Sequence, residues 1–297
     1  MIKPRFKKKL LVTGASGLLG RRVCREAAKS YDVHGTSFKN DIVIPDVTIC
    51  KADLTFFEEI VKLFKEFQPD AVIHTAAASN PDYCQTRHQL SRKINIDVTV
   101  HLAKLCAQAD IPFIFTSSDL VFNGRAAPYR ESDPVSPISL YGEHKAEAEN
   151  SVLSAWPKAA VVRIPLLYDS DRSVSRNFFP QMVQAMQIGQ KLRLFTDEYR
   201  TPLSVRTGAS ALLKVVENVS GLIHLGGPER ISRYDFGLLI ARVMKLTSAR
   251  LIPCLQRDMP MPAPRPCDVS LDSAKAHALI NFNPPPLTEE IHRNLII

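Results

Sequence analysis

Short apolar runs alternate with amphipathic stretches along the first half of the chain, as far as Pro165. The apolar runs are rich in β-branched residues and predict six buried strands, at 9–12, 32–37, 47–50, 71–74, 113–116 and 160–164. Between them, apolar residues recur every three or four positions and predict helices over 17–29, 55–67, 89–108 and 140–154. Thr55 is the expected N-cap of the second helix, with Glu58 completing a capping box. This order predicts an α/β fold with a Rossmann-like, doubly wound parallel sheet.

The pattern changes after Pro165. We expect a helix near 177–188, a strand pair at 192–195 and 203–205, and then helix, strand and helix to about Leu246. Five prolines lie between Pro253 and Pro266, which predicts an extended segment or a loop over a cleft. We therefore expect a larger domain over residues 1–165 and a smaller α/β lobe over 166–297, with parts of the chain crossing between them.

Composition narrows the class of protein. The 297 residues are 45% hydrophobic and 23% charged, which is typical of a globular chain with a sizeable core. The six cysteines are scattered without zinc-site spacing, so we expect free thiols and no metal site. No apolar run approaches the roughly 20 residues of a membrane helix, and the basic start leads directly into a strand. These features predict a cytoplasmic protein without a membrane partner.

The net charge of +8 raises the question of nucleic-acid binding. Clustered basic residues occur only in the arm at 3–9, and no recognition-helix, zinc-finger or RNA-binding signature accompanies them. We therefore expect no nucleic-acid partner. A positive field instead favours anionic small molecules, such as those that carry a pyrophosphate.

A glycine-rich turn follows the first predicted strand and opens the first predicted helix, where a dinucleotide-binding turn belongs. Gly14 permits the sharp turn, Gly17 lets the backbone approach a pyrophosphate, and Gly20 lets the helix press on the sheet. The expected cofactor contacts of this turn are Gly14, Ser16, Gly17, Leu18 and Leu19. Residues 1–165 are therefore the expected NAD(P)-binding domain.

The second strand ends without the acidic residue that an NAD site usually offers to the ribose, since residues 35–40 contain no acid and the first one after the strand is Asp41. Arg21, Ser37 and Lys39 can instead bind a 2′-phosphate, which favours NADP(H) and leaves NAD(H) possible. Asp53 and Leu54 follow the third strand, where an adenine edge is hydrogen-bonded, although Asp53 can equally cap the helix that follows.

Tyr141 and Lys145 lie four residues apart on a predicted helix, so their side chains share one face. An ammonium beside a phenol stabilises the phenolate and lowers the pKa of the phenol toward neutrality. Ser118, just after the fifth strand, can hydrogen-bond a substrate oxygen where negative charge develops. These residues predict a reduction in which the cofactor delivers hydride and Tyr141 donates the proton.

Three motifs carry a family resemblance: T-G-x-x-G-x-x-G, S-S-D-x-V-F-x-G and Y-G-x-x-K-x-x-x-E. They resemble the extended short-chain dehydrogenase/reductase superfamily and, within it, the dTDP-4-dehydrorhamnose reductase family, over essentially the whole chain. The resemblance implies an NADPH-dependent reductase of a 4-keto nucleotide sugar, in which Ser118 and Tyr141 act on the substrate and Lys145 holds the nicotinamide ribose. Further expected cofactor contacts are Ala76, Ala77, Asn95 and Pro165. The expected substrate contacts are Ser118, Asp119, Asn177, Arg200 and Arg265.

Other functions stay open. A sugar dehydratase of this superfamily has an acidic pair after the catalytic Ser or Thr, whereas Leu120 follows Asp119 here. No motif separates a reductase from a nucleotide-sugar epimerase. The regulatory subunit of methionine adenosyltransferase also resembles this family and shares S-S-D-x-V-F, so a dinucleotide-binding partner protein is a further alternative. A homodimer is possible for any of them.

Overall fold

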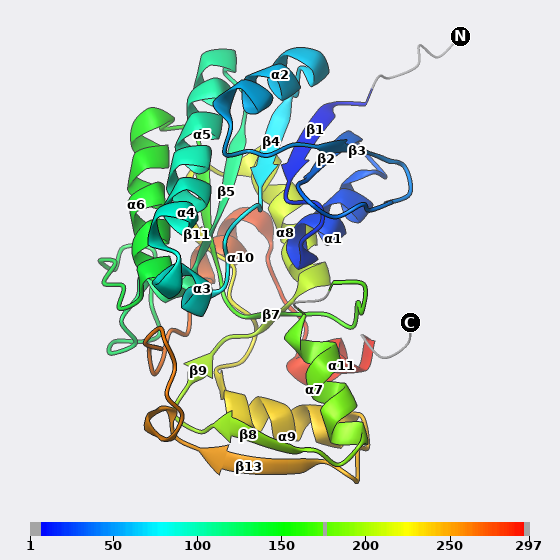
Figure 1. The fold of residues 1–297 in the computed structure, drawn as a ribbon, viewed down its shortest axis with the longest axis vertical. Helices are drawn as coiled ribbons and strands as arrows, with labels where there is room; N and C mark the ends of the chain where they lie inside the picture. Colours follow the sequence, from blue (N-terminus) through cyan, green and yellow to red (C-terminus); the bar gives the residue numbers. More distant parts are fainter. Residues whose placement is uncertain (1–6, 175–176, 294–297) are drawn as a thin grey trace.

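The computed structural model describes residues 7–174 and 177–293, which contain a seven-stranded parallel sheet with helices on both faces (Figure 1). The strand order is β11-β6-β5-β4-β1-β2-β3. The strands are β1 (Lys9–Thr13), β2 (Asp32–Ser37), β3 (Val47–Lys51), β4 (Ala71–His74), β5 (Phe113–Ser118), β6 (Ala160–Ile164) and β11 (Gly221–His224). The predicted Rossmann-like sheet is confirmed, and all six predicted strands belong to it.

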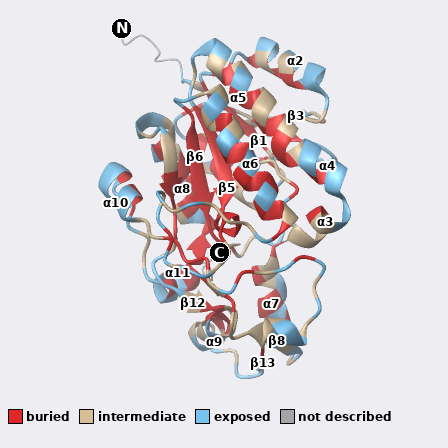
Figure 2. Ribbon diagram, turned by 90° about the vertical axis from the view of Figure 1, so that its left-hand side faces the viewer, coloured by how far each residue is buried: buried red, intermediate tan, exposed pale blue. Residues whose placement is uncertain are grey.

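Apolar faces of the helices pack on the two sides of this sheet, and the central strands are buried between them (Figure 2). One side is covered by α1 (Leu18–Ala27), α8 (Val205–Asn218) and α10 (Ala274–Ile280). The other side is covered by α2 (Phe57–Phe67), α5 (Val98–Ala109) and α6 (Leu140–Ala155). Because β1, β4 and β5 are buried on both faces, their sequences are continuous apolar runs rather than alternating ones.

Two predicted helices differ in detail. The helix expected over 89–108 consists of α4 (His88–Arg92), a π-helical turn (Lys93–Asp97) and α5, preceded by the short α3 (Pro81–Thr86). The predicted capping box of Thr55 and Glu58 is wrong, because α2 begins at Phe57 and Phe56 precedes it without a side-chain cap. The hydroxyl and N–H of Thr55 bond Asp53 instead, which closes a local turn before the helix.

The smaller lobe lies beyond the carboxyl ends of the strands. It consists of β7 (Leu167–Tyr168), α7 (Phe178–Gln187), β8 (Lys191–Phe195), β9 (Tyr199–Arg200), β10 (Leu203–Ser204), β12 (Ile231–Ser232), α9 (Arg233–Val243), β13 (Arg250–Cys254) and α11 (Leu287–Arg293). The predicted strand pair is wrong in its partners: β8 pairs with β13 and β10 with β7. Periodicity locates a strand but does not reveal its neighbour. Of the five prolines between Pro253 and Pro266, Pro253 lies within β13 and the other four follow that strand.

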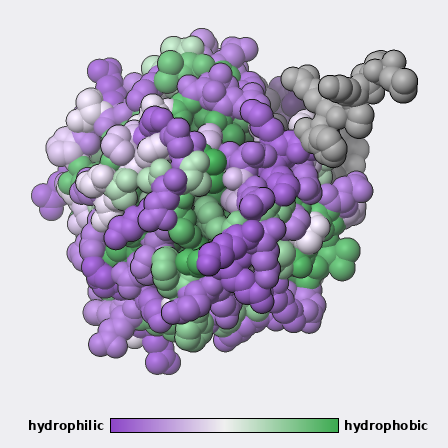
Figure 3. All heavy atoms as spheres, turned by 90° about the horizontal axis from the view of Figure 1, so that it is seen from above, coloured by the Kyte–Doolittle hydropathy of each residue, from purple (hydrophilic) through white to green (hydrophobic). Residues whose placement is uncertain are grey.

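The chain crosses between the two parts more than once. After entering the small lobe it returns to the large sheet with α8 and β11, and later with α10. The division at residue 165 therefore stays a prediction. In the described ranges, no helix has the length and apolarity needed to cross a bilayer, and no three or more His, Cys, Asp or Glu side chains form a metal-binding group. Seen from above, the molecule is mostly hydrophilic, with smaller hydrophobic areas (Figure 3).

Candidate active site

The three expected catalytic side chains meet at the carboxyl edge of the sheet. Ser118 ends β5, and its hydroxyl donates to Asp119 at 3.1 Å and accepts from the N–H of Leu120 at 3.2 Å. Ser118 also lies near enough to the Tyr141 hydroxyl to lower the pKa of that phenol. The Nζ atom of Lys145 lies 5.9 Å from the centre of the Tyr141 ring. The structure therefore brings the phenol, the amine and the hydroxyl together, as the sequence predicts.

Local packing at the start of α6 sets this geometry. Ser139 caps the helix by accepting from the N–H of Gly142 at 3.3 Å, which places Tyr141 in the first turn. A Cβ atom at Gly142 would lie 2.2 Å from the carbonyl oxygen of Leu120. Only glycine therefore lets α6 approach the turn after Ser118 this closely. Gly142 belongs to the Y-G-x-x-K motif, and a serine directly before a helix, as at Ser139, is a preferred N-cap residue.

Lys145 is almost fully buried, and its ammonium donates to the carbonyl of Thr116 at 2.8 Å. It also lies 4.6 Å from the centre of the Phe115 ring, within cation–π distance. Burial lowers the pKa of Lys145 to about 8, against the opposing effect of the Glu149 carboxylate. Lys145 therefore remains largely protonated at neutral pH.

The sequence predicts that Lys145 lowers the pKa of Tyr141 toward neutrality, but in the structure this pKa is raised. Burial raises the pKa of Tyr141, and the negative charge of Asp119 raises it further, whereas the Ser118 side chain lowers it. The protein alone thus keeps Tyr141 protonated. A protonated phenol is the form that donates a proton, which suits reduction of a carbonyl group.

The expected substrate contact Arg200 is occupied by carboxylates. Its Nη1 donates to Asp119 at 2.7 Å, and its Nη2 lies 3.5 Å from Glu198. Burial acts to lower the pKa of Arg200, but the two carboxylates outweigh this effect and raise it. Asp119, also an expected substrate contact, is the partner of Arg200 in this ion pair. Both residues lie at the site but face each other.

The glycine turn is shaped for a phosphate group. Gly14 has a φ of +77°, and a Cβ atom there would lie 2.7 Å from the backbone nitrogen of Ala76. At Gly20 a Cβ atom would lie 2.3 Å from the carbonyl oxygen of Gly14. Gly17 is the N-cap of α1, which has no side-chain cap and no acid in its first turn. The positive helix end therefore remains available to an anion, beside Ser16, Leu18 and Leu19.

The three residues expected at a 2′-phosphate do not form one group. Arg21 pairs with Asp171 at 3.8 Å, and the hydroxyl of Ser37 donates to the carbonyl of Asn40 at 2.6 Å. The Nζ atom of Lys39 lies 5.2 Å from the ring centre of Phe38, which is 55% exposed. Within the described part of the chain, Lys39 forms no ion pair. Its ammonium lies over the Phe38 ring, just after the end of β2, and is paired with no carboxylate of the described residues.

Other expected cofactor contacts lie along the same edge. Asn95 sits in the π-helical turn, and its side-chain amide accepts from the N–H of Ala78 at 2.8 Å and donates to its carbonyl at 3.1 Å. This contact fixes the loop after β4 that contains Ala76 and Ala77. Asp53 and Leu54 follow β3, and Pro165 follows β6. Their cofactor contacts stay predictions.

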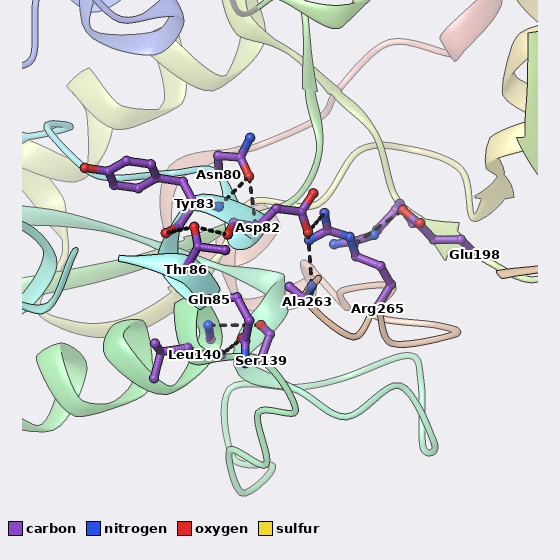
Figure 4. Close-up of polar contacts among 12 residues, drawn as sticks. Asn80, Asp82, Tyr83, Gln85, Thr86, Ser139, Leu140, Glu198, Ala263 and Arg265 are labelled. Atoms are coloured by element: carbon purple, nitrogen blue, oxygen red, sulfur yellow. Dashed lines mark hydrogen bonds and ion pairs between the residues drawn. The ribbon is translucent and has the colours of Figure 1, made fainter. Parts of the chain in front are cut away.

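The remaining substrate candidates belong to the small lobe. Asn177 caps α7, and its amide nitrogen donates to the carbonyls of Asp169 at 2.7 Å and Asp171 at 2.9 Å, so its donors are already used. Figure 4 shows Arg265 directed at Asp82 of α3, where its Nη2 donates at 3.1 Å. The N–H of Ala263 donates to the same carboxylate at 3.2 Å. The proline-rich segment is thus tied to the large domain.

One candidate was missed from the sequence. Arg233 begins α9, and its guanidinium carbon lies 4.6 Å from the centre of the Phe178 ring. Its Nη1 is buried without a hydrogen-bond partner. Burial lowers the pKa of Arg233, and the nearby charges of Arg200 and Arg265 lower it further, whereas Glu198 raises it. An arginine at a helix start forms no recognisable motif. Only the fold shows that Arg233 lies near Arg200 and Arg265.

A family model described as RmlD substrate binding domain matches residues 8–296. Methionine adenosyltransferase 2 subunit beta of Rattus norvegicus is 31% identical over 92% of this chain and 82% of that protein. The probable low-salt glycan biosynthesis reductase Agl14 of Haloferax volcanii is 30% identical over 94% and 95%.

Solved structures agree with the fold. A dTDP-4-dehydrorhamnose reductase from Clostridium acetobutylicum superposes with a TM-score of 0.82 at 29% identity, over 97% of this chain and 98% of that one. Other solved structures with this fold hold NADP or NAD, at 22% identity or less. Those more distant likenesses establish the architecture of the chain.

Proposed function

This chain belongs to the RmlD substrate binding domain family, and from that premise we propose that it reduces a 4-keto nucleotide sugar with NADPH, as a dTDP-4-dehydrorhamnose reductase does. The observation that carries the proposal is the convergence of Ser118, Tyr141 and Lys145 at the edge where the glycine turn opens. Ligands of doubly wound sheets bind at this carboxyl edge. The relatives with reductase names support the same reaction.

The residues present fit a nicotinamide dinucleotide. The cradle at Gly14 and Gly20 leaves no room for a Cβ atom, and the uncapped start of α1 offers free N–H groups to a pyrophosphate. Lys39 offers a cation to a 2′-phosphate, which supports NADP(H) over NAD(H). When bound, the reduced nicotinamide supplies the hydride for carbonyl reduction.

The chain's own residues supply the proton and the orientation. Ser118 hydrogen-bonds the carbonyl oxygen of the substrate, and Tyr141 donates its phenolic proton to that oxygen as the carbon receives hydride. The product is the alcohol, the oxidised cofactor and a phenolate at Tyr141. The ammonium of Lys145 stabilises this phenolate until it takes a proton back from solvent.

The substrate's phosphates have a basic partner in the small lobe. Arg200 and Arg265 both lie close enough to Arg233 for their charges to act on it, and Arg200 is neutralised by its carboxylates. The buried, unpartnered Nη1 of Arg233 supports an anionic ligand here. A guanidinium binds a phosphate through two donors. We therefore assign the pyrophosphate to Arg233 and Arg265.

The test is reduction of dTDP-4-dehydrorhamnose and related keto sugars, followed by the absorbance of NADPH. In Tyr141→Phe we expect kcat to fall by about two to four orders of magnitude, because the proton donor is lost. Tyr31→Phe, which removes a phenol hydroxyl bonded to Glu217 away from the site, is the matched control and keeps its activity. Absence of oxidation with every keto sugar would refute the proposal.

A second function has support from the rat relative, which is a methionine adenosyltransferase subunit. Under this alternative the chain binds the dinucleotide and docks on a synthetase, without turnover. A synthetase that co-purifies with Tyr141→Phe as well as with the parent, together with no keto-sugar reduction by the parent, would favour the regulatory role.

A further inference from the structure

Three neighbouring strands, β5, β6 and β11, each place a buried polar side chain in one row across the sheet. On β5 this row passes through Ser117, the residue before Ser118. The parallel register places Ser117 of β5 beside Arg163 of β6, and Arg163 beside His224 of β11. Arg163 is 2% exposed and His224 is fully buried. A buried guanidinium costs several kcal/mol unless it is paired and hydrogen-bonded, so this row requires a counter-charge.

Glu149 of α6 supplies that charge. Its carboxylate accepts from Nε of Arg163 at 3.0 Å and from Nη2 at 2.7 Å, and it also accepts from the hydroxyl of Ser117. Nη1 of Arg163 donates to Nε2 of His224 at 3.2 Å. Because Nε2 accepts, Nδ1 of His224 carries the proton, which it donates to the carbonyl of Tyr129 at 3.1 Å. The row is thus fully paired.

The same carboxylate lies one helical turn after Lys145. Lys145 holds the carbonyl of Thr116, and Glu149 holds the hydroxyl of Ser117, so successive turns of α6 bind successive residues of β5. Ser118 is the next residue along the strand. A shift of α6 along β5 would break both contacts. This double attachment fixes the helix that carries Tyr141 against the strand that carries Ser118.

We propose that Glu149, clamped by Arg163, is a positioning residue that keeps the Lys145 ammonium charged and holds α6 in register with Ser118. The proposal rests on the proposed function of the same site. Glu149 touches neither substrate nor cofactor and acts through Lys145 and Ser117.

The titratable groups around the Lys145 site are Tyr141 and Glu149 on α6, Cys84 on α3, His74 on β4, and Asp119 in the turn after β5. Burial raises the pKa of Cys84 and of Tyr141 and lowers the pKa of His74 to about 3, so these three are neutral at pH 7. Asp119 is paired with Arg200. Glu149 is itself paired with Arg163, but its carboxylate raises the pKa of Lys145 against the effect of burial, whereas Asp119 is not among the charges that act on Lys145. The Glu149 carboxylate is therefore the anion that sustains the Lys145 charge.

The test measures Lys145 directly in the full chain. With 15N-labelled lysine, the Nζ resonance of Lys145 is assigned by its loss in Lys145→Met and is titrated by NMR. In Glu149→Gln we expect the titration midpoint to fall by about one pH unit or more. We expect the pH at which kcat/KM for keto-sugar reduction declines on the alkaline side to fall by a similar amount. Glu147→Gln removes an exposed carboxylate of the same helix and is the matched control, with both values unchanged.

The outcomes are separable. An unchanged Lys145 midpoint in Glu149→Gln overturns the proposal, even if the variant is less stable. A lowered midpoint in a protein that reduces no keto sugar supports the positioning role and refutes the proposed reaction. If Glu149→Gln does not fold because Arg163 is left unpaired, the double variant Glu149→Gln/Arg163→Met leaves no buried charge unpaired. Its Lys145 midpoint must also fall, and an unchanged value overturns the proposal.

Discussion

Arg200 of β9 donates a hydrogen bond of 2.7 Å to Asp119, the residue that follows Ser118. Both side chains are buried, and the contact joins the small lobe to the carboxyl end of β5. Asp119 raises the pKa of Tyr141 and Arg200 lowers it, so the pair balances the charge beside the phenol. The geometry favours this neutralising role for Arg200 over the expected contact with a substrate phosphate.

Breaking this pair should reduce stability. In Arg200→Met the carboxylate of Asp119 remains buried without its partner, and we expect the free energy of unfolding to fall by about 3–5 kcal/mol. Urea denaturation measures the change. Arg130→Met removes an exposed partner of Asp272 and should cost about 1 kcal/mol or less. A normal unfolding curve for Arg200→Met with a raised KM for substrate would instead identify Arg200 as a substrate ligand.

Much of the large domain could be predicted from the sequence because buried parallel strands leave a local signal. The runs at 9–12, 71–74 and 113–116 are continuous and apolar because both faces of these strands are covered. The small lobe leaves a weaker signal. Its strands are short or partly exposed, and the pairing of β8 with β13 joins segments separated by more than 50 residues. No local pattern reveals such a partner.

The site divides in the same way. Tyr141, Lys145 and the glycine turn are local motifs, so the sequence alone identified them and the structure brings Tyr141 and Lys145 together with Ser118. Ion pairs between distant segments have no such motif. The partners of Arg200 and Arg265, which decide whether each guanidinium is free, appear only in three dimensions.

Acid should destabilise the fold through its buried histidines. Burial, reinforced by Arg163, lowers the pKa of His224 from 6.5 to about 4. Below pH 6.5 the unfolded chain binds a proton that the folded chain does not, so stability is lost between about pH 6.5 and 4. Each such histidine contributes a slope of about 1.4 kcal/mol per pH unit.

Replacing one of these histidines should make the pH dependence shallower. In His224→Gln one proton fewer is taken up on unfolding. We therefore expect the slope of the unfolding free energy against pH to decrease by about 1.4 kcal/mol per pH unit over this range. Guanidinium denaturation at several pH values measures it. The exposed His277 is the matched control, and His277→Gln should leave the slope of the parent. A parental slope in His224→Gln would show that His224 is protonated in the fold.

Lys39 should set the preference between the two dinucleotides. Lys39→Glu places an acid at the end of β2, where it repels a 2′-phosphate and can accept from a ribose hydroxyl. We expect Kd for NADPH to rise by about tenfold or more and Kd for NADH to stay level or fall, as measured by fluorescence titration. Lys62→Glu makes the same charge change on an exposed site of α2. Equal weakening of both dinucleotides would place the 2′-phosphate elsewhere.

Arg265 and Asp82 should act on substrate binding in opposite directions. Asp82 holds the guanidinium that we assign to the substrate pyrophosphate, so the carboxylate and the phosphate compete for it. In Arg265→Met we expect KM for the nucleotide sugar to rise by about tenfold with kcat little changed, because the lost contact is equal in ground and transition states. In Asp82→Asn the guanidinium is released and KM should fall. Arg257→Met, exposed in the same segment, is the control. A rise in KM in both variants would mean that the pair only orders the proline-rich segment, and the phosphate contact would then belong to Arg233 alone.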